Sequence, residues 1–145
     1  DKRVENVTFN QNVLIEAFDN YSKGKSRIAL DGHFCLINKN GDLEKVPKDI
    51  FKSLNPSILF LVYAPEEIIQ MRLNKRKDKI RLNINLKYFQ KEEKRYSVEI
   101  ANMLEIPLFQ IDSTKTAKVN FKVIKNAFDQ ILCDEQITFL EKEGS

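Results

Sequence analysis

The sequence has little of several residue types on which common protein classes depend. Its 145 residues include one histidine, His33, and two cysteines, Cys35 and Cys133, without a C-x-x-C spacing. A metal site built from several histidines is therefore excluded, and the cysteines favour a reducing, intracellular setting over a disulfide-stabilised scaffold. The longest apolar run, residues 58–64, is far shorter than the roughly 20 residues of a membrane-spanning helix. These absences predict a soluble, cytoplasmic domain without a membrane partner.

The length and the apolar content are those of one compact domain. A chain of 145 residues falls within the usual range of about 100–200 residues per domain, and 42% of the residues are hydrophobic, which is enough for a core. No internal repeat, low-complexity tract or Pro/Gly-rich linker interrupts the chain. We therefore expect a single domain over residues 1–145.

Positive charge is concentrated in one short segment. The net charge is +3, but residues 71–81 alone hold six cations and one anion. This favours a local anionic partner such as phosphate over a broad nucleic-acid-binding face. Arg72 and Arg76 are four residues apart and share a helical face, at a helix end where basic residues also suit the helix dipole. Because guanidinium groups bind phosphate oxygens bidentately, we favour the functional interpretation.

The hydrophobic pattern predicts alternating helices and strands. Helices are expected over residues 9–21, 47–54, 65 into the basic segment, 84–104 and 121–132, and strands over residues 28–30, 34–37, 43–46, 58–63 and 107–111. The Asn40-Gly41 pair predicts a hairpin turn, and the unbroken apolar run at 58–63 is typical of a strand buried on both faces of a parallel sheet. The expected fold class is α/β, with a parallel sheet flanked by helices.

Three helices have candidate core faces that a structure can test. The expected apolar stripes are Val13, Leu14, Ala17, Phe18 and Tyr21 in the first helix, Leu86, Phe89, Tyr96, Ile100 and Met103/Leu104 in the long helix, and Phe121, Ile124, Phe128 and Ile131/Leu132 in the last. Glu93 alone interrupts the stripe of the long helix. Residues 134–145 are expected to form one more helix or a frayed end.

The tripeptide Gly24-Lys25-Ser26 matches only the end of the phosphate-loop pattern G-x-x-x-x-G-K-[ST]. The pattern also requires a glycine where this chain has Asp19, and a strand before the loop with a helix after it. Here a helix is expected before the tripeptide and a strand after it. We therefore interpret it as an ordinary turn.

Ligands of α/β sheets bind at the carboxyl ends of the strands. Three expected strands end in polar or turn-forming residues, namely residues 31–33, 63–65 and 112–114. Asp31 is placed to hold a magnesium ion through its water, although it is equally suited to capping the following turn. His33 is a candidate for substrate binding, with an ordinary structural role as the alternative.

At Leu30-Asp31-Gly32-His33 and at Arg72-Leu73-x-x-Arg76 the sequence resembles the P-loop nucleotide and small-molecule kinases. It is most similar to archaeal-type adenylate kinases and related bacterial ATP-binding proteins, over residues 28–113. The resemblance implies an adenylate kinase-like P-loop NTPase fold with a short lid at about residues 74–83, and ATP and Mg²⁺ as cofactors.

The resemblance also implies roles for individual residues. Asp31 would be the magnesium-associated acid, Arg72 would lie against the adenine or the ATP phosphates, and Arg76 and Arg81 would reach the transferred phosphoryl group. By the same resemblance, Ser113 and Thr114 would border the adenine.

The chain departs from this family in two places. The glycine-rich phosphate loop is absent, and the resemblance places it on a first strand N-terminal to the residues given, so we expect about 30–50 residues to precede Asp1 in the parent protein. In bacterial adenylate kinases Phe-Pro-Arg follows Asp-Gly and its arginine helps to hold AMP. Here His33-Phe34-Cys35 follows instead.

The expected function is ATP-dependent phosphoryl transfer to a nucleotide (AMP-like) or another small-molecule acceptor. One alternative is a nucleotide-binding regulatory ATPase without a dedicated acceptor. The other is a non-enzymatic module that binds nucleic acid or protein through residues 72–81. The sequence lacks the aromatic–basic alternation that stacked bases require, which disfavours nucleic acid.

Overall fold

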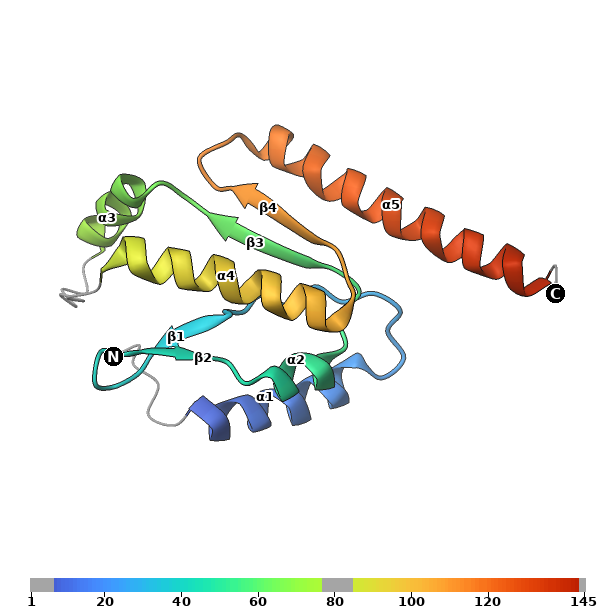
Figure 1. Cartoon of the computed structure of the whole chain (residues 1–145), viewed down its shortest axis with the longest axis horizontal. Helices are drawn as coiled ribbons and strands as arrows, with labels where there is room; N and C mark the ends of the chain where they lie inside the picture. Colours follow the sequence, from blue (N-terminus) through green and yellow to red (C-terminus); the bar gives the residue numbers. More distant parts are fainter. Residues whose placement is uncertain (1–6, 77–84, 144–145) are drawn as a thin grey trace.

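The computed structural model describes residues 7–76 and 85–143, and the side chains of residues 10–76 and 85–131 (Figure 1). The helices are α1 (Val7–Ser22), α2 (Lys48–Leu54), α3 (Glu66–Lys75), α4 (Leu86–Leu104) and α5 (Ala117–Glu143), and the strands are β1 (Cys35–Ile37), β2 (Leu43–Lys45), β3 (Leu59–Tyr63) and β4 (Leu108–Asp112). Nearly every expected element is therefore present. Among the described residues, none of the helices combines the length and the hydrophobicity needed to cross a lipid bilayer.

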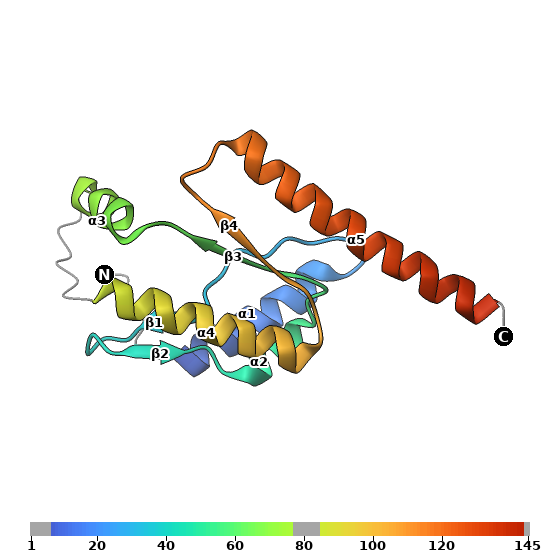
Figure 2. The ribbon, with the colours of Figure 1, turned by 45° about the horizontal axis from the view of Figure 1, so that its top comes forward.

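Strands β3 and β4 pair in parallel, in a register that runs from Leu59 opposite Leu108 to Tyr63 opposite Asp112. The connection between them passes through α3 and α4. Helix α4 packs against both strands and α5 packs against β4, on opposite sides of the pair in both views (Figures 1 and 2). The α/β fold with a parallel sheet and flanking helices is thus confirmed, with two parallel strands in the described residues.

Strands β1 and β2 form the expected antiparallel hairpin, with Cys35 opposite Lys45. The side chain of Asn38 organises its tip, because Oδ1 accepts hydrogen bonds from the backbone N–H groups of Asn40 (2.9 Å) and Asp42 (3.0 Å). Gly41 has a φ of 87°, a left-handed conformation that favours glycine. The Asn-Gly signal in the sequence therefore identified the turn correctly.

The core lies between α4, the hairpin, α2 and β3. Its buried members are Phe34, Cys35, Val46, Ile50, Phe51, Leu61, Tyr96 and Ile100. The ring of Phe51 stacks on Phe34 at 5.5 Å and meets Tyr96 edge-on at 6.2 Å. The hydroxyl of Tyr96 donates to the carbonyl oxygen of Val46, so the one polar end of this aromatic cluster is satisfied.

Two expectations about strands are wrong. Residues 28–30 form no strand, and the side chain of Leu30 is 46% exposed. Strand β3 is not buried on both faces, since Val62 is 60% exposed. A strand needs a neighbour to satisfy its backbone, and residues 28–30 pair with no strand in the described part of the chain. The exposure of Val62 has a different cause, because it depends on how far the described elements cover the faces of β3 and not on the pairing of its edges.

The expected faces of α1 and α5 are only partly correct. In α1, Val13, Ala17 and Tyr21 are exposed, while Leu14, Ile15 and Phe18 are half-buried. Among the described elements, α1 packs substantially only against α2. It therefore buries only a narrow stripe of side chains.

Among the described side chains of α5, Ala127 is fully buried, whereas Phe121 is 64% exposed and Phe128 is 46% exposed. Helix α5 packs against β4, and the centroid of the Phe128 ring lies 6.2 Å from that of Phe60. The expected tail at 134–143 continues α5 without a break.

The thiol of Cys35 is expected to be unreactive in the folded chain. Burial, with a further contribution from the Glu93 carboxylate, raises its pKa from the ordinary 9.0 to about 11. Near about pH 8 this lowers the thiolate fraction about 100-fold. Mass spectrometry of the peptide that contains Cys35 should therefore show alkylation by iodoacetamide at least about 100-fold slower in the native chain than in urea. Equal rates would contradict the buried position.

Candidate functional site

The carboxyl ends of β3 and β4 are joined to α3 by one side chain. Ser113, directly after β4, donates its backbone N–H to the carbonyl oxygen of Tyr63 at 2.9 Å and so extends the strand pairing. Arg72 on α3 donates from Nη1 to Ser113 Oγ (2.9 Å) and from Nη2 to the Ser113 carbonyl oxygen (3.2 Å). The structure thus brings together two of the predicted nucleotide-binding residues, which are 41 positions apart in the sequence.

The loop after β4 is held by a set of short local hydrogen bonds. Asp112 Oδ1 accepts from the hydroxyl of Thr114 (2.6 Å) and from its backbone N–H (2.9 Å). These two bonds, the hydroxyl first, hold the pKa of the Asp112 carboxyl below its ordinary value. The carbonyl oxygen of Asp112 accepts from the backbone N–H of Lys115 (3.1 Å) and from Asn120 Nδ2 (3.0 Å). The third predicted nucleotide-binding residue, Thr114, therefore supports the loop with its hydroxyl.

Helix α3 carries acids at its start and bases at its end. Pro65 precedes it at the N-cap, Glu66 and Glu67 lie in the first turn, and Arg72 and Lys75 lie in the last turn. This arrangement complements the helix dipole, which makes the N-terminus positive and the C-terminus negative. Lys75 and Arg76 follow Arg72 by three and four positions in the sequence, and Arg76 is the C-cap residue. The side chains of both are exposed to solvent. The expected site residue Arg81 and most of the expected lid at 74–83 lie outside the described residues.

Asp31 and His33 lie in the irregular, exposed segment that leads into β1. Asp31 consequently does not follow a strand, in contrast to the expectation. Among the side chains described, those of residues 10–76 and 85–131, no group of three or more His, Cys, Asp and Glu is placed to hold a metal ion. A water-mediated Mg²⁺ contact needs only one or two carboxylates together with the phosphates, so the role of Asp31 as a magnesium-associated acid is not tested by this finding and stays a prediction. The turn at Gly24-Lys25-Ser26 is an ordinary helix end, with Gly24 at a φ of 75°.

Glu93 is a half-buried carboxylate that the sequence analysis did not single out as a site residue. Burial raises its pKa above the ordinary value, while the charge of His33 and the backbone N–H groups of Phe34 and Cys35 act in the opposite direction. Glu93 thus connects α4 to the start of β1, and Tyr96 one turn later connects α4 to Val46 at the end of β2. The sequence feature that could have identified Glu93 as a buried carboxylate is its position within the apolar stripe of α4, which it interrupts.

The position of Glu93 has a consequence for stability against pH. The folded chain retains the Glu93 proton to a higher pH than the unfolded chain, so this group stabilises the fold at low pH and loses that effect as the pH rises through its folded pKa. In urea titrations at about pH 4 and about pH 7 we compare the free energy of unfolding of Glu93→Gln with that of the unsubstituted chain. We expect the variant to be relatively more stable near about pH 7 than near about pH 4. The opposite trend would contradict the raised pKa.

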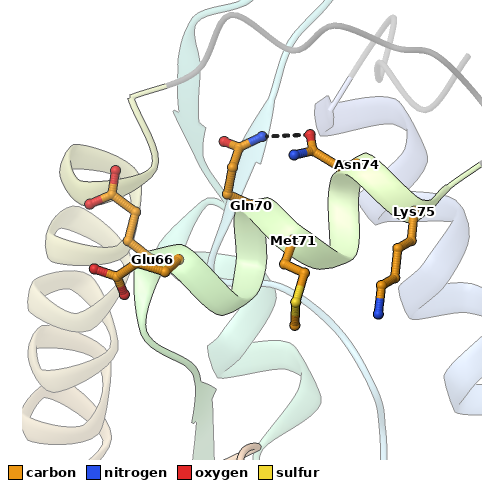
Figure 3. Close-up of a pocket in the computed structure, with 6 residues that line it drawn as sticks. Glu66, Gln70, Met71, Asn74 and Lys75 are labelled. Atoms are coloured by element: carbon orange, nitrogen blue, oxygen red, sulfur yellow. Dashed lines mark hydrogen bonds between the residues drawn. The ribbon is translucent and has the colours of Figure 1, made fainter.

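A shallow depression lies along the exposed side of α3. Its lining residues are Glu66, Glu67, Gln70, Met71, Asn74 and Lys75, and Gln70 Nε2 donates to Asn74 Oδ1 at 3.0 Å (Figure 3). All of these residues come from one helix, so within residues 7–76 and 85–143 no second element closes over a ligand. The depression also excludes Arg72 and Ser113. We therefore place the candidate site at the Arg72–Ser113 contact.

A family model described as an AAA domain matches residues 2–90, which is more than half of the chain and includes Arg72 but not Ser113. No curated protein and no solved structure matches the chain significantly.

Proposed function

The chain belongs to the AAA domain family of nucleotide-binding, P-loop NTPase-like proteins, and from this premise we propose that it binds ATP through Arg72 and transfers the γ-phosphoryl group to a nucleotide or another small acceptor. Nucleotide binding is the property of the family. The position of the phosphates, the transfer step and the class of acceptor are the proposal.

The observation that carries the proposal is the double hydrogen bond between Arg72 and Ser113 at the carboxyl ends of two parallel strands. This edge is where α/β sheets bind their ligands. A guanidinium group has five N–H donors, of which Ser113 accepts two, so three remain for the oxygens of a phosphate. The site therefore offers a fixed cation with free donors at the place where a phosphate is expected.

In the proposed arrangement, charge neutralisation is the main contribution of the chain. Phosphoryl transfer spreads negative charge over the oxygens of the moving group, and cations placed beside it lower the barrier. Arg76, the C-cap residue of α3, supplies a second guanidinium group four positions after Arg72 in the sequence. Thr114, in the loop after β4, borders the nucleotide. When bound, Mg²⁺ would be held mainly by the phosphates and by water, with Asp31 as the carboxylate that the sequence resemblance assigns to it.

Product analysis tests the proposal. The chain is incubated with ATP and a panel of nucleoside monophosphates and hydroxyl compounds, and ADP, inorganic phosphate and phosphorylated acceptor are quantified. We expect one phosphorylated acceptor molecule for each ADP. Inorganic phosphate in place of a phosphorylated acceptor would support the regulatory ATPase instead. Absence of ADP under all conditions would contradict both.

A further inference from the structure

We propose that Ser113 is a positioning residue that acts through Arg72, holding its guanidinium at the carboxyl edge of β3 and β4, and that it does not itself bind the nucleotide. The inference rests on the proposed function and assigns Ser113 a different role from the adenine contact that the sequence resemblance implies.

The hydrogen bonds of Ser113 support this role. Its backbone N–H is engaged with the Tyr63 carbonyl, and both of its oxygens accept hydrogen bonds from Arg72. Among the donors of Ser113, only the hydroxyl proton is left for the oxygens of a phosphate. Arg72, by contrast, keeps three of its five donors, including at least one on each terminal nitrogen. A phosphate that arrives at this edge therefore has more to gain from Arg72 than from Ser113.

The loop gives Ser113 the rigidity that positioning requires. Asp112 before it accepts two hydrogen bonds from Thr114, and the side chain of Asn120 ties the Asp112 carbonyl to the first turns of α5. The backbone that carries Ser113, including the carbonyl oxygen that holds Arg72, is thereby held relative to β4 and α5. This matters because the arginine side chain has several rotatable bonds and loses conformational entropy when it binds a ligand. Holding it beforehand reduces that loss.

A double-mutant cycle tests the inference. ATP affinity is measured by calorimetry for the unsubstituted chain, Ser113→Ala, Arg72→Ala and the double variant. Loss of the positioning hydroxyl is expected to weaken binding about threefold to tenfold. In the Arg72→Ala background the same substitution is expected to have no further effect, because Ser113 then has nothing to hold. Ser113→Thr, which retains the hydroxyl, should recover most of the affinity.

The matched control is Ser53→Ala, which removes an exposed serine hydroxyl on α2 and should leave ATP affinity unchanged. A second readout needs no nucleotide: NMR of the arginine side chains should show slow rotation of the Arg72 guanidinium, and faster rotation in Ser113→Ala. Additive losses in the cycle, or an unchanged affinity in Ser113→Ala, would overturn the inference alone. Failure of the unsubstituted chain to bind ATP would overturn the proposed function and this inference with it.

Discussion

Arg72→Ala is expected to weaken ATP binding about 10- to 100-fold, the usual effect of losing hydrogen bonds from a charged donor. Binding of adenosine, which has no phosphate, should change little. Arg72→Lys should be intermediate, because a lysine retains the charge but has no planar fork with which to contact Ser113 and a phosphate together. Titration calorimetry with ATP, ADP, AMP and adenosine measures the series.

Arg95→Ala is the matched control for Arg72→Ala, since it removes an exposed arginine from α4. Its ATP affinity should stay within about twofold of that of the unsubstituted chain. An equal loss for adenosine and ATP in Arg72→Ala would show that Arg72 maintains the fold or contacts the base, and would contradict its assignment to the phosphates. A similar loss in Arg95→Ala would indicate that binding depends only on overall charge.

Ile100→Ala is expected to have the largest effect on stability. Ile100 is 0% exposed on the face of α4 that packs against the hairpin, α2 and β3. Truncating such a side chain leaves a cavity and costs about 2–5 kcal/mol. Domains of this kind have unfolding free energies of about 5–15 kcal/mol, so much of the total is lost. Urea denaturation followed by circular dichroism measures the change.

Val98→Ala provides the comparison within the same helix. Val98 is 42% exposed, so its truncation should change the free energy of unfolding by no more than about 0.5 kcal/mol. Equal losses for the two variants would mean that α4 presents another face to the core. The two variants thus test how α4 is oriented about its own axis. This orientation also places Glu93 and Tyr96.

Sequence periodicity predicted α4 well because that helix packs against several elements along its length. Tyr96 and Ile100, taken from the apolar stripe, are both in the core. Helix α1 was predicted at nearly its observed length, but its buried face was not, because it rests mainly on α2. The expected strand at 28–30 failed for a related reason. Local apolar residues do not tell whether a neighbouring strand is present to pair with them.

The candidate site was predictable in part. The rule that ligands bind at the carboxyl ends of parallel strands, together with the family resemblance, singled out Arg72 and Ser113 before their contact was known. The hydrogen bonds between them were not predictable, since they depend on how α3 returns toward the loop after β4. Glu93 was noticed only as a gap in a stripe, because burial and the proximity of His33 arise from tertiary packing.

The most direct test of the central claim is an ATP titration of the unsubstituted chain, followed by calorimetry and by NMR of the backbone amides. The account predicts saturable binding with a dissociation constant of about 1 mM or tighter, and the largest amide shifts at Ser113, Thr114 and the end of α3. Absence of heat and of shifts up to about 10 mM ATP would contradict it.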